Sequence, residues 1–220
     1  MDKDLQYSNL YQTPLNRERG GGGYGIYLFL AVLLAFALCF RTWWTDNYGG
    51  VQVDGASMNQ TLEHGERLLM RYVEDGEGLE RGDVIVVYVG GYEECKNILG
   101  GYLIKRLIAI EGDKVKCTDG QIYICYAGTD EYLPLDEPYA YYTNQTAYDF
   151  EGQEYVVGEG EIFFLGDNRN NSCDSRYKEY LGSHLTDRLY KATDVYGVVP
   201  EWAIEHSETL EKFFFRNTTR

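Results

Sequence analysis

Residues 102–110 read YLIKRLIAI, an apolar run that is interrupted by two adjacent basic side chains, Lys105 and Arg106. This composition is typical of a β-strand, in which successive side chains point to opposite faces. Lys105 is therefore expected to share its face with aliphatic side chains only, namely Leu103, Leu107 and Ala109. Arg106 is expected on the other face with Ile104, Ile108 and Ile110.

Further strand-like runs lie on both sides of this stretch, separated by glycine and aspartate. They are residues 84–89, 114–117, 121–125, 154–157 and 161–165. Asp119-Gly120 lies between two of them and is a typical hairpin turn. Helical periodicity is sparse, and its best candidate is residues 185–192. The sequence predicts a mostly β domain with Greek-key or barrel-like closure. It also predicts an acidic, tyrosine-rich surface excursion at residues 126–153, whose tyrosines serve in packing.

The chain has 220 residues and a formal net charge of −15, from 35 acidic and 20 basic side chains. A nucleic-acid-binding protein needs a basic surface, so this class is excluded. Residues 20–40 carry no charge, and residues 1–23 are neutral overall, so the excess negative charge lies after residue 40. Five cysteines in a chain of this length indicate neither a disulfide scaffold nor a spaced metal site.

The uncharged region contains fifteen consecutive apolar residues, IYLFLAVLLAFALCF at 26–40. As a helix this run spans roughly 22 Å, and the flanking glycines and Arg41-Thr42-Trp43-Trp44 extend it towards the ~30 Å of a bilayer core. A buried core helix would seldom have such aromatic interfacial markers on one side. Ala35-Phe36-Ala37 resembles a signal-peptide cleavage site, but the apolar run continues to Phe40. We therefore predict a single transmembrane helix, with the β domain after it in the chain.

Basic residues close to the span indicate its orientation. Arg17 and Arg19 precede it and only Arg41 follows shortly after, which places the N-terminus in the cytoplasm. The predicted organisation is a cytoplasmic arm at 1–23, an anchor in the cell membrane at 24–44, an extracytoplasmic domain at 45–205 and a tail at 206–220.

Ser57 and Lys105 are the first candidates for chemistry. A lysine among aliphatic side chains loses hydration, which lowers its pKa and leaves a neutral amine that can activate a serine hydroxyl. On composition alone, a charged edge strand is the simpler interpretation of Lys105. The three histidines are scattered, and no HExxH or paired CxxC spacing occurs, so neither a metal nor a cofactor is expected.

Four segments, taken in their order along the chain, favour a catalytic role for Lys105 over a charged edge strand. The segments are Ser57-Met58 with Thr61-Leu62, Gly82-Asp83 with the strand after it, Lys105-Arg106 with Gly112-Asp113, and GDNRNNSCDSR at 166–176. Together they resemble the nucleophile, strand, general-base and C-terminal boxes of bacterial type I signal peptidases, over residues 24–199. The resemblance implies the signal-peptidase β fold behind the membrane helix.

The resemblance also implies roles for single residues. Ser57 would be the nucleophile, with its N–H as an oxyanion donor, and Lys105 would be the general base. Met58 would line a shallow pocket for small substrate side chains. Ser172 would hydrogen-bond the Lys105 amine. The supporting residues would be the Asp174–Arg176 ion pair, Asp167 and Arg169 as braces of the loop, and Gly55, where some relatives carry a hydroxyl oxyanion donor.

Besides Gly55, which carries no hydroxyl, one position and one stretch depart from the pattern of the resemblance. Gln60 stands where many members have proline, and the stretch 177–192 is longer than the usual link to the last strand. The implied function is a membrane-anchored serine endopeptidase that cleaves signal peptides from secreted preproteins after small residues, through an acyl-enzyme. Its partners would be preprotein signal peptides and the lipid bilayer. The alternatives are an anchored signal-peptide-binding module with a degenerate site and a self-cleaving Ser/Lys protease.

Overall fold

The computed structural model describes residues 23–92, 95, 98–142, 154–176 and 190–214. Its internal contacts divide the chain into two units, Met1–Trp44 and Thr45–Arg220, and each is described by itself.

A single long helix, α1, runs from Gly23 to Asn47 and accounts for the described part of the first unit. At 1.5 Å per residue, its 25 residues span about 37 Å, more than the hydrocarbon core of a bilayer. Among the described residues, α1 is the one helix that is both long enough and apolar enough to cross a membrane. None of its apolar segment is buried. This exposure differs from that of a core helix in a soluble domain, whose apolar face is covered.

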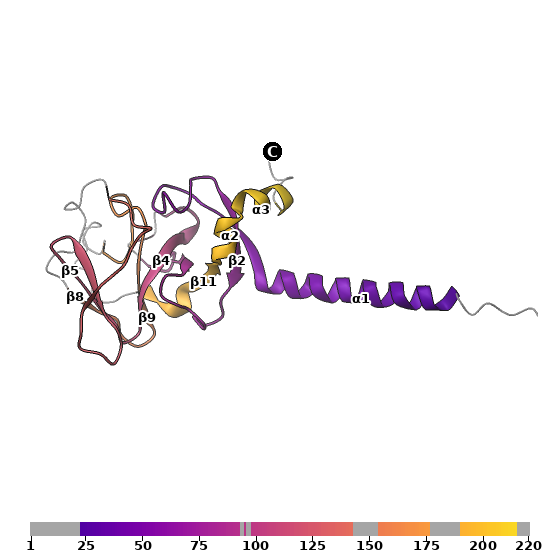
Figure 1. Ribbon diagram of the computed structural model, residues 1–220, viewed down its shortest axis with the longest axis horizontal. Helices are drawn as coiled ribbons and strands as arrows, with labels where there is room; N and C mark the ends of the chain where they lie inside the picture. The colour runs from indigo at the N-terminus through magenta and orange to yellow at the C-terminus, as the bar shows by residue number, and fades with distance from the viewer. Residues whose placement is uncertain (1–22, 93–94, 96–97, 143–153, 177–189, 215–220) are drawn as a thin grey trace, which may run out of the picture. The chain divides into compact units, whose positions relative to one another are not determined.

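The second unit is built from two antiparallel sheets (Figure 1). The larger sheet has the order β1-β2-β11-β3-β4-β9-β10. Its strands are β1 (Tyr48–Gln52), β2 (Arg67–Tyr72), β11 (Val195–Val199), β3 (Val84–Tyr88), β4 (Tyr102–Ile110), β9 (Glu161–Leu165) and β10 (Tyr190–Lys191). The predicted mostly β fold is confirmed.

The smaller sheet has the order β7-β6-β5-β8. Its strands are β7 (Leu133–Pro134), β6 (Gln121–Cys125), β5 (Lys114–Thr118) and β8 (Glu154–Val156). The predicted hairpin joins β5 to β6, and both turn residues have positive φ, 53° at Asp119 and 75° at Gly120. A two-residue turn of this kind matches the twist of the flanking strands, which explains the Asp-Gly sequence.

Strand β9 is buried on both faces and joins two apolar cores. Phe163 and Leu165 pack with residues of the smaller sheet, whereas Ile162 and Phe164 pack with residues of β3, β4 and β11. An uninterrupted apolar strand is the expected sequence for such a position. Because β4 pairs with β3 on one side and with β9 on the other, the strand that carries Lys105 lies inside the larger sheet rather than at its edge.

The structure corrects the strict alternation predicted for β4. A bulge between Leu107 and Ala109 shifts the register, so that Ile108 and Ala109 both join the same core. An extra residue in one strand of a pair disrupts the ladder in this way and bends the strand. The expected faces hold from Tyr102 to Leu107, the part that contains Lys105.

The predicted helix at 185–192 is wrong where the structure describes it. Tyr190 pairs with Ile162 at the sheet edge, and its ring packs in a tilted arrangement against Phe164 with 4.7 Å between centroids. Tertiary packing thus outweighs a weak helical pattern. The 3₁₀ turn η3 (Ala192–Asp194) follows β10, while residues 185–189 lie outside the described residues. A second 3₁₀ turn, η2 (Leu99–Gly101), precedes β4.

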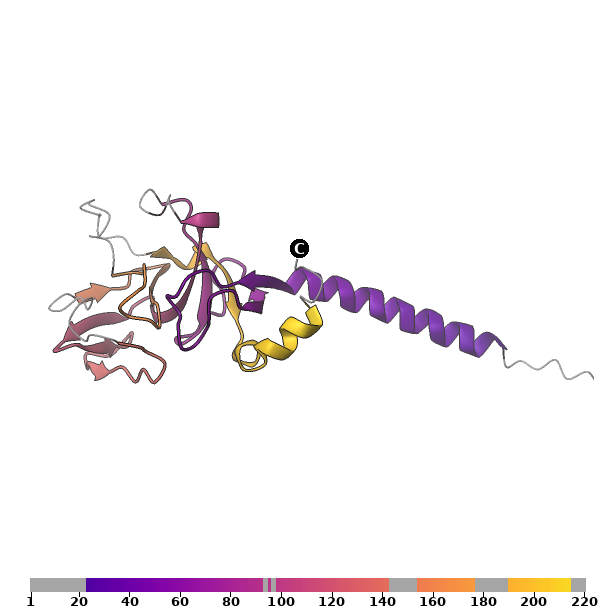
Figure 2. The same cartoon turned by 90° about the horizontal axis from the view of Figure 1, so that it is seen from above.

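Two short helices, α2 (Glu201–Glu205) and α3 (Ser207–Phe214), end the described chain (Figures 1 and 2). The predicted tail at 206–220 therefore begins with a helix that contacts β2. Within the predicted surface excursion at 126–153, residues 133–134 add a strand to the smaller sheet, and residues 143–153 lie outside the described residues.

Candidate active site

Ser57 and Lys105 are in direct contact although they are 48 positions apart. Ser57 lies in the loop between β1 and β2, and Lys105 lies on β4. The Lys105 amine donates hydrogen bonds to Ser57 Oγ at 2.6 Å and to the carbonyl of Ile104 at 2.8 Å. The Lys105 side chain is buried, with 2 % of the residue exposed. The predicted pair is thus brought together, with Lys105 buried and Ser57 partly exposed to solvent.

Burial lowers the pKa of Lys105 from 10.5 to about 8. The desolvation of the ammonium is the largest cause, and the negative charges of Asp174 and Asp167 partly oppose it. The desolvation expected from aliphatic neighbours therefore outweighs two nearby carboxylates. A neutral amine is accessible near physiological pH, which is what an amine needs to accept a proton from a hydroxyl.

The Ser57 loop is shaped by a turn and by a left-handed glycine. The N–H groups of Thr61 and Leu62 both donate to the carbonyl of Met58, at 3.0 and 2.8 Å. Gly55 has φ of +96° and its N–H donates to His64 Nδ1 at 3.0 Å. Such a φ is unfavourable for a residue with a Cβ, so the glycine serves the backbone here.

The loop 166–176 contains the expected ion pair between Asp174 and Arg176. Arg176 Nε lies 2.9 Å from one carboxylate oxygen of Asp174 and Nη2 lies 2.9 Å from the other. The N–H of Gly166 also donates to this carboxylate, at 3.0 Å. Burial alone would raise the pKa of Asp174, but the charge of Arg176 and these hydrogen bonds more than offset it, so the pKa lies below its ordinary value.

Ser172 does not form the expected hydrogen bond with Lys105. The amine is already bonded to Ser57 and Ile104, whereas Ser172 Oγ is buried and interacts with the Asp174 carboxylate, whose pKa this interaction helps to lower. The Ser172 side chain instead packs against the backbone of Gly166. A Cβ added to Gly166 would lie 2.2 Å from Ser172 Oγ and 2.6 Å from the Ser57 carbonyl oxygen. Gly166 thus allows the two serine segments to approach each other.

Asp167 and Arg169 both lie in buried ion pairs, but with partners that the sequence did not indicate. Arg106 binds both carboxylate oxygens of Asp167, at 2.8 and 2.6 Å, and Thr61 Oγ1 donates to the same carboxylate at 2.6 Å. Arg169 pairs with Glu137. Asp167 thereby joins the nucleophile loop to β4.

Asn168 holds the nucleophile loop through two further hydrogen bonds that sequence reasoning missed. Its N–H donates to the carbonyl of Ser57 and its side-chain Nδ2 donates to the carbonyl of Ala56, both at 3.0 Å. An asparagine within a run of asparagine and aspartate is ordinarily a turn residue, so composition gave no signal for this role.

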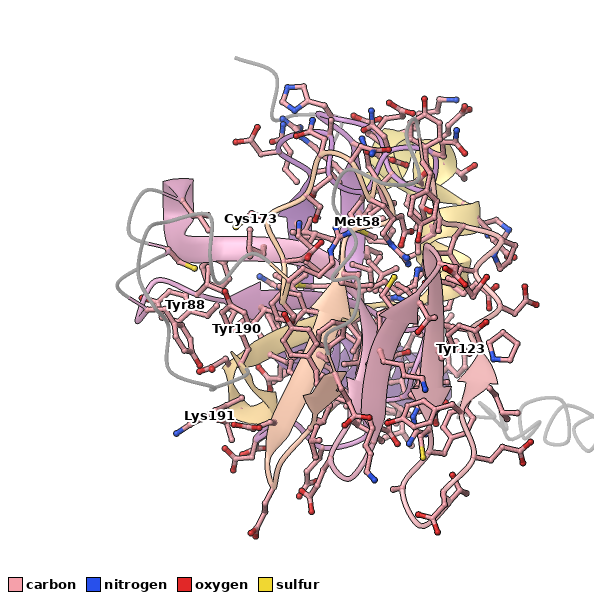
Figure 3. All side chains as sticks on the ribbon, turned by 90° about the vertical axis from the view of Figure 1, so that its left-hand side faces the viewer. Met58, Tyr88, Tyr123, Cys173, Tyr190 and Lys191 are labelled. Atoms are coloured by element: carbon pink, nitrogen blue, oxygen red, sulfur yellow. The ribbon has the colours of Figure 1, made fainter. Side chains whose placement is uncertain are left out.

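Met58 is expected to line a substrate pocket. The residue is 1 % exposed, so its side chain is buried, and the pocket role stays a prediction. Figure 3 labels Met58 and Cys173, which lie towards the same end of the domain in that view. Cys173 is exposed. Among the described residues there is no group of three or more His, Cys, Asp or Glu side chains that could hold a metal ion.

Residues 24–204 match the model of a protein family described as signal peptidase, peptidase S26. The chain belongs to this signal peptidase family. It is 35 % identical over 126 residues to signal peptidase I U of Bacillus subtilis (strain 168), which covers 56 % of this chain and 63 % of that protein. It is also 35 % identical over 160 residues to signal peptidase I of Bacillus licheniformis, covering 68 % and 74 %.

A solved structure of signal peptidase I from Enterococcus faecalis V583 is similar to this chain at 27 % identity. It covers 56 % of this chain and 98 % of that one, with a TM-score of 0.38. The chain spans less than two thirds of the length of the Bacillus subtilis relative.

Proposed function

We propose that this member of the signal peptidase family is a membrane-anchored serine endopeptidase that removes signal peptides from secreted preproteins. The observation that carries the proposal is the 2.6 Å contact between Ser57 Oγ and the buried amine of Lys105, whose pKa is lowered to about 8. A serine hydroxyl beside an amine that can be neutral is an activated nucleophile.

In the proposed reaction the neutral Lys105 amine takes the hydroxyl proton of Ser57 while Oγ attacks the scissile carbonyl. The Lys105 ammonium then gives this proton to the leaving amine, the C–N bond breaks, and an ester to Ser57 remains. Water hydrolyses the ester with Lys105 again as base. The hydrogen bond from Lys105 to the Ile104 carbonyl orients the amine during both steps.

The remaining site residues support this chemistry without taking part in proton transfer. The Ser57 N–H is the proposed oxyanion donor. Asp167, Asp174 and Arg176 fix the loop that faces Ser57, and Ser172 fills the space beside Gly166. Gly55 supplies the left-handed turn before the nucleophile, where no side-chain hydroxyl is present. Met58 forms the floor under the small substrate side chains.

Helix α1 is the proposed anchor, with residues 1–23 in the cytoplasm and the β domain outside it. A substrate whose apolar segment is still in the same bilayer would then meet the site at a raised effective concentration. The support for this topology is the length and composition of α1 together with Arg17 and Arg19 before it.

The decisive test is incubation of the full chain, solubilised in detergent, with a preprotein, followed by mass spectrometry of the new N-terminus. We expect one cut after a small residue, and none with Ser57→Ala. Binding of the preprotein without cleavage would favour the binding-module alternative, and a cut within the chain itself would favour a self-cleaving protease.

A further inference from the structure

A short segment of the surface excursion lies against the loop that faces the nucleophile. We call residues 137–142, with the sequence EPYAYY, the strap. The N–H of Tyr141 donates to the carbonyl of Asp167 at 2.7 Å, and the N–H of Arg169 donates to the carbonyl of Tyr141 at 3.0 Å. Tyr141 and Asn168 thereby form a parallel β-bridge. The strap is thus attached by main-chain hydrogen bonds on both sides of Asn168.

The opposite edge of the same residue faces the nucleophile. Asn168 donates its N–H to the carbonyl of Ser57 and its side-chain amide to the carbonyl of Ala56. Residues 167–169 therefore lie between the strap and the nucleophile loop, as a central strand lies between two neighbours. Hydrogen bonds on both edges of a segment restrict its position more than bonds on one edge alone, because each set must break before the segment can move.

A buried ion pair locks the strap in place. Arg169 is 1 % exposed and bonds to both carboxylate oxygens of Glu137, which is 8 % exposed at its side chain. Arg169 Nη1 also donates to the Tyr142 hydroxyl at 2.8 Å, and Nε donates to the Gly166 carbonyl at 3.1 Å. A bidentate carboxylate is the strongest partner available to a buried guanidinium, and its removal leaves that charge unpaired.

The strap also contacts the second arginine of the site. The ring of Tyr139 lies 3.9 Å from the guanidinium carbon of Arg106, and Arg106 holds Asp167, to which Thr61 of the nucleophile loop donates. A cation on an aromatic face is stabilised most where both are sheltered from water. Arg106, which holds Asp167, and Arg169 itself are therefore both contacted by strap side chains.

We propose that the strap positions the nucleophile and that Glu137 is a positioning residue for the cleavage reaction. Glu137 fixes Arg169, the strap fixes Asn168, and Asn168 fixes the carbonyls of Ala56 and Ser57, so that Ser57 Oγ stays at the Lys105 amine. This inference rests on the proposed function and gives a role to an excursion whose tyrosines were otherwise expected to serve only in packing.

The test uses Glu137→Gln in the full detergent-solubilised chain, with Asp136→Asn as the matched control. Asp136 is the neighbouring carboxylate and is exposed, so both variants lose one negative charge. For Glu137→Gln we expect kcat for a preprotein to fall about 10- to 100-fold with KM within twofold, because small misplacements of a reacting group cost this much. The fall should be uniform across pH, since Glu137 is not among the groups that shift the pKa of Lys105. The control should behave as the unmodified chain.

Hydrogen exchange supplies a readout that does not depend on activity. The amide of Asn168 should exchange about tenfold faster in Glu137→Gln than in Asp136→Asn, because the loop that donates it is loosened. Unchanged exchange and unchanged kcat would overturn the inference, and so would a variant in which only KM rises. If the unmodified chain cleaves no preprotein, the proposed function fails, while the exchange result still decides whether the strap holds Asn168.

A gentler variant covers the case in which Glu137→Gln does not fold. Tyr142→Phe removes only the hydroxyl that accepts from Arg169, so about a threefold fall in kcat is expected. A kcat equal to that of the unmodified chain in this variant, in the absence of a folded Glu137→Gln, would contradict the inference.

Discussion

The pH dependence of cleavage tests the Ser57–Lys105 pair most directly. With a pKa of about 8, about one Lys105 amine in ten is neutral at pH 7, whereas at the ordinary value of 10.5 it would be about one in three thousand. Burial therefore raises the fraction of competent base about 300-fold at this pH. If neutral Lys105 is the base, activity should rise with pH in proportion to the neutral fraction and level off above pH 9.

The assay is steady-state cleavage of a preprotein between pH 6 and 10, with kcat/KM from the substrate dependence at each pH. We expect a single ionisation near pH 8 and about a tenfold rise from pH 6 to 7. The folded fraction, followed by circular dichroism over the same range, separates titration of the base from unfolding.

Two results would refute this reasoning. A rate that is flat between pH 6 and 9 would mean that no group with the lowered pKa of Lys105 limits the reaction. An ionisation near 10.5 would mean that the lysine is hydrated in solution, and that its burial among aliphatic side chains does not persist when substrate binds.

Three further perturbations have defined outcomes. Lys105→Arg should cleave no preprotein in the same assay, because a guanidinium does not give up its proton in this range, and measurable turnover would exclude Lys105 as the base. Lys105→Met should raise the free energy of unfolding at pH 7 by up to about 3 kcal/mol in urea titrations. The folded-state pKa of about 8 lies below the unfolded value, so the unmodified chain loses stability as the pH falls from 10.5 to 8 and carries the full cost below 8. An unchanged or lower free energy of unfolding in Lys105→Met at pH 7 would argue against a destabilisation by the buried Lys105 ammonium. Gly166→Ala should reduce kcat by more than tenfold and lower stability by about 1–3 kcal/mol, because its Cβ would lie 2.6 Å from the Ser57 carbonyl oxygen. Normal turnover would show that the loop tolerates a shift.

The strands with strong apolar patterns could be predicted from sequence almost to the residue. The bounds of β4, β6 and β9 equal those expected at 102–110, 121–125 and 161–165. Such a short apolar run is favourable as a strand that is buried among its neighbours, which fixes both its type and its length. The bulge after Leu107 was not predictable, because it depends on how β9 pairs across the sheet rather than on β4 itself.

The partners of the charged residues were the part of the site that sequence could not supply. Arg106 and Asp167 are 61 positions apart, and Arg169 and Glu137 are 32 apart. Composition identifies such residues as polar, but their pairing follows from sheet register and loop packing. Register would have found the first pair: Arg106 lies opposite Leu165, and Asp167 follows two residues later. No equivalent rule leads from Arg169 to Glu137.

The two ion pairs explain how a lysine can have a lowered pKa among carboxylates. Asp167 and Asp174 each raise the pKa of Lys105, yet each is bound by an arginine through both carboxylate oxygens, Arg106 in the first case and Arg176 in the second. Each arginine places a positive charge beside the carboxylate it binds, and desolvation is the largest cause of the shift and outweighs the charges of Asp174, Cys173 and Asp167. The loop therefore gains strong charge-assisted hydrogen bonds without placing net negative charge beside its base. Removal of either arginine would leave a buried carboxylate facing Lys105, which would raise the pKa of the amine and weaken it as a base at neutral pH.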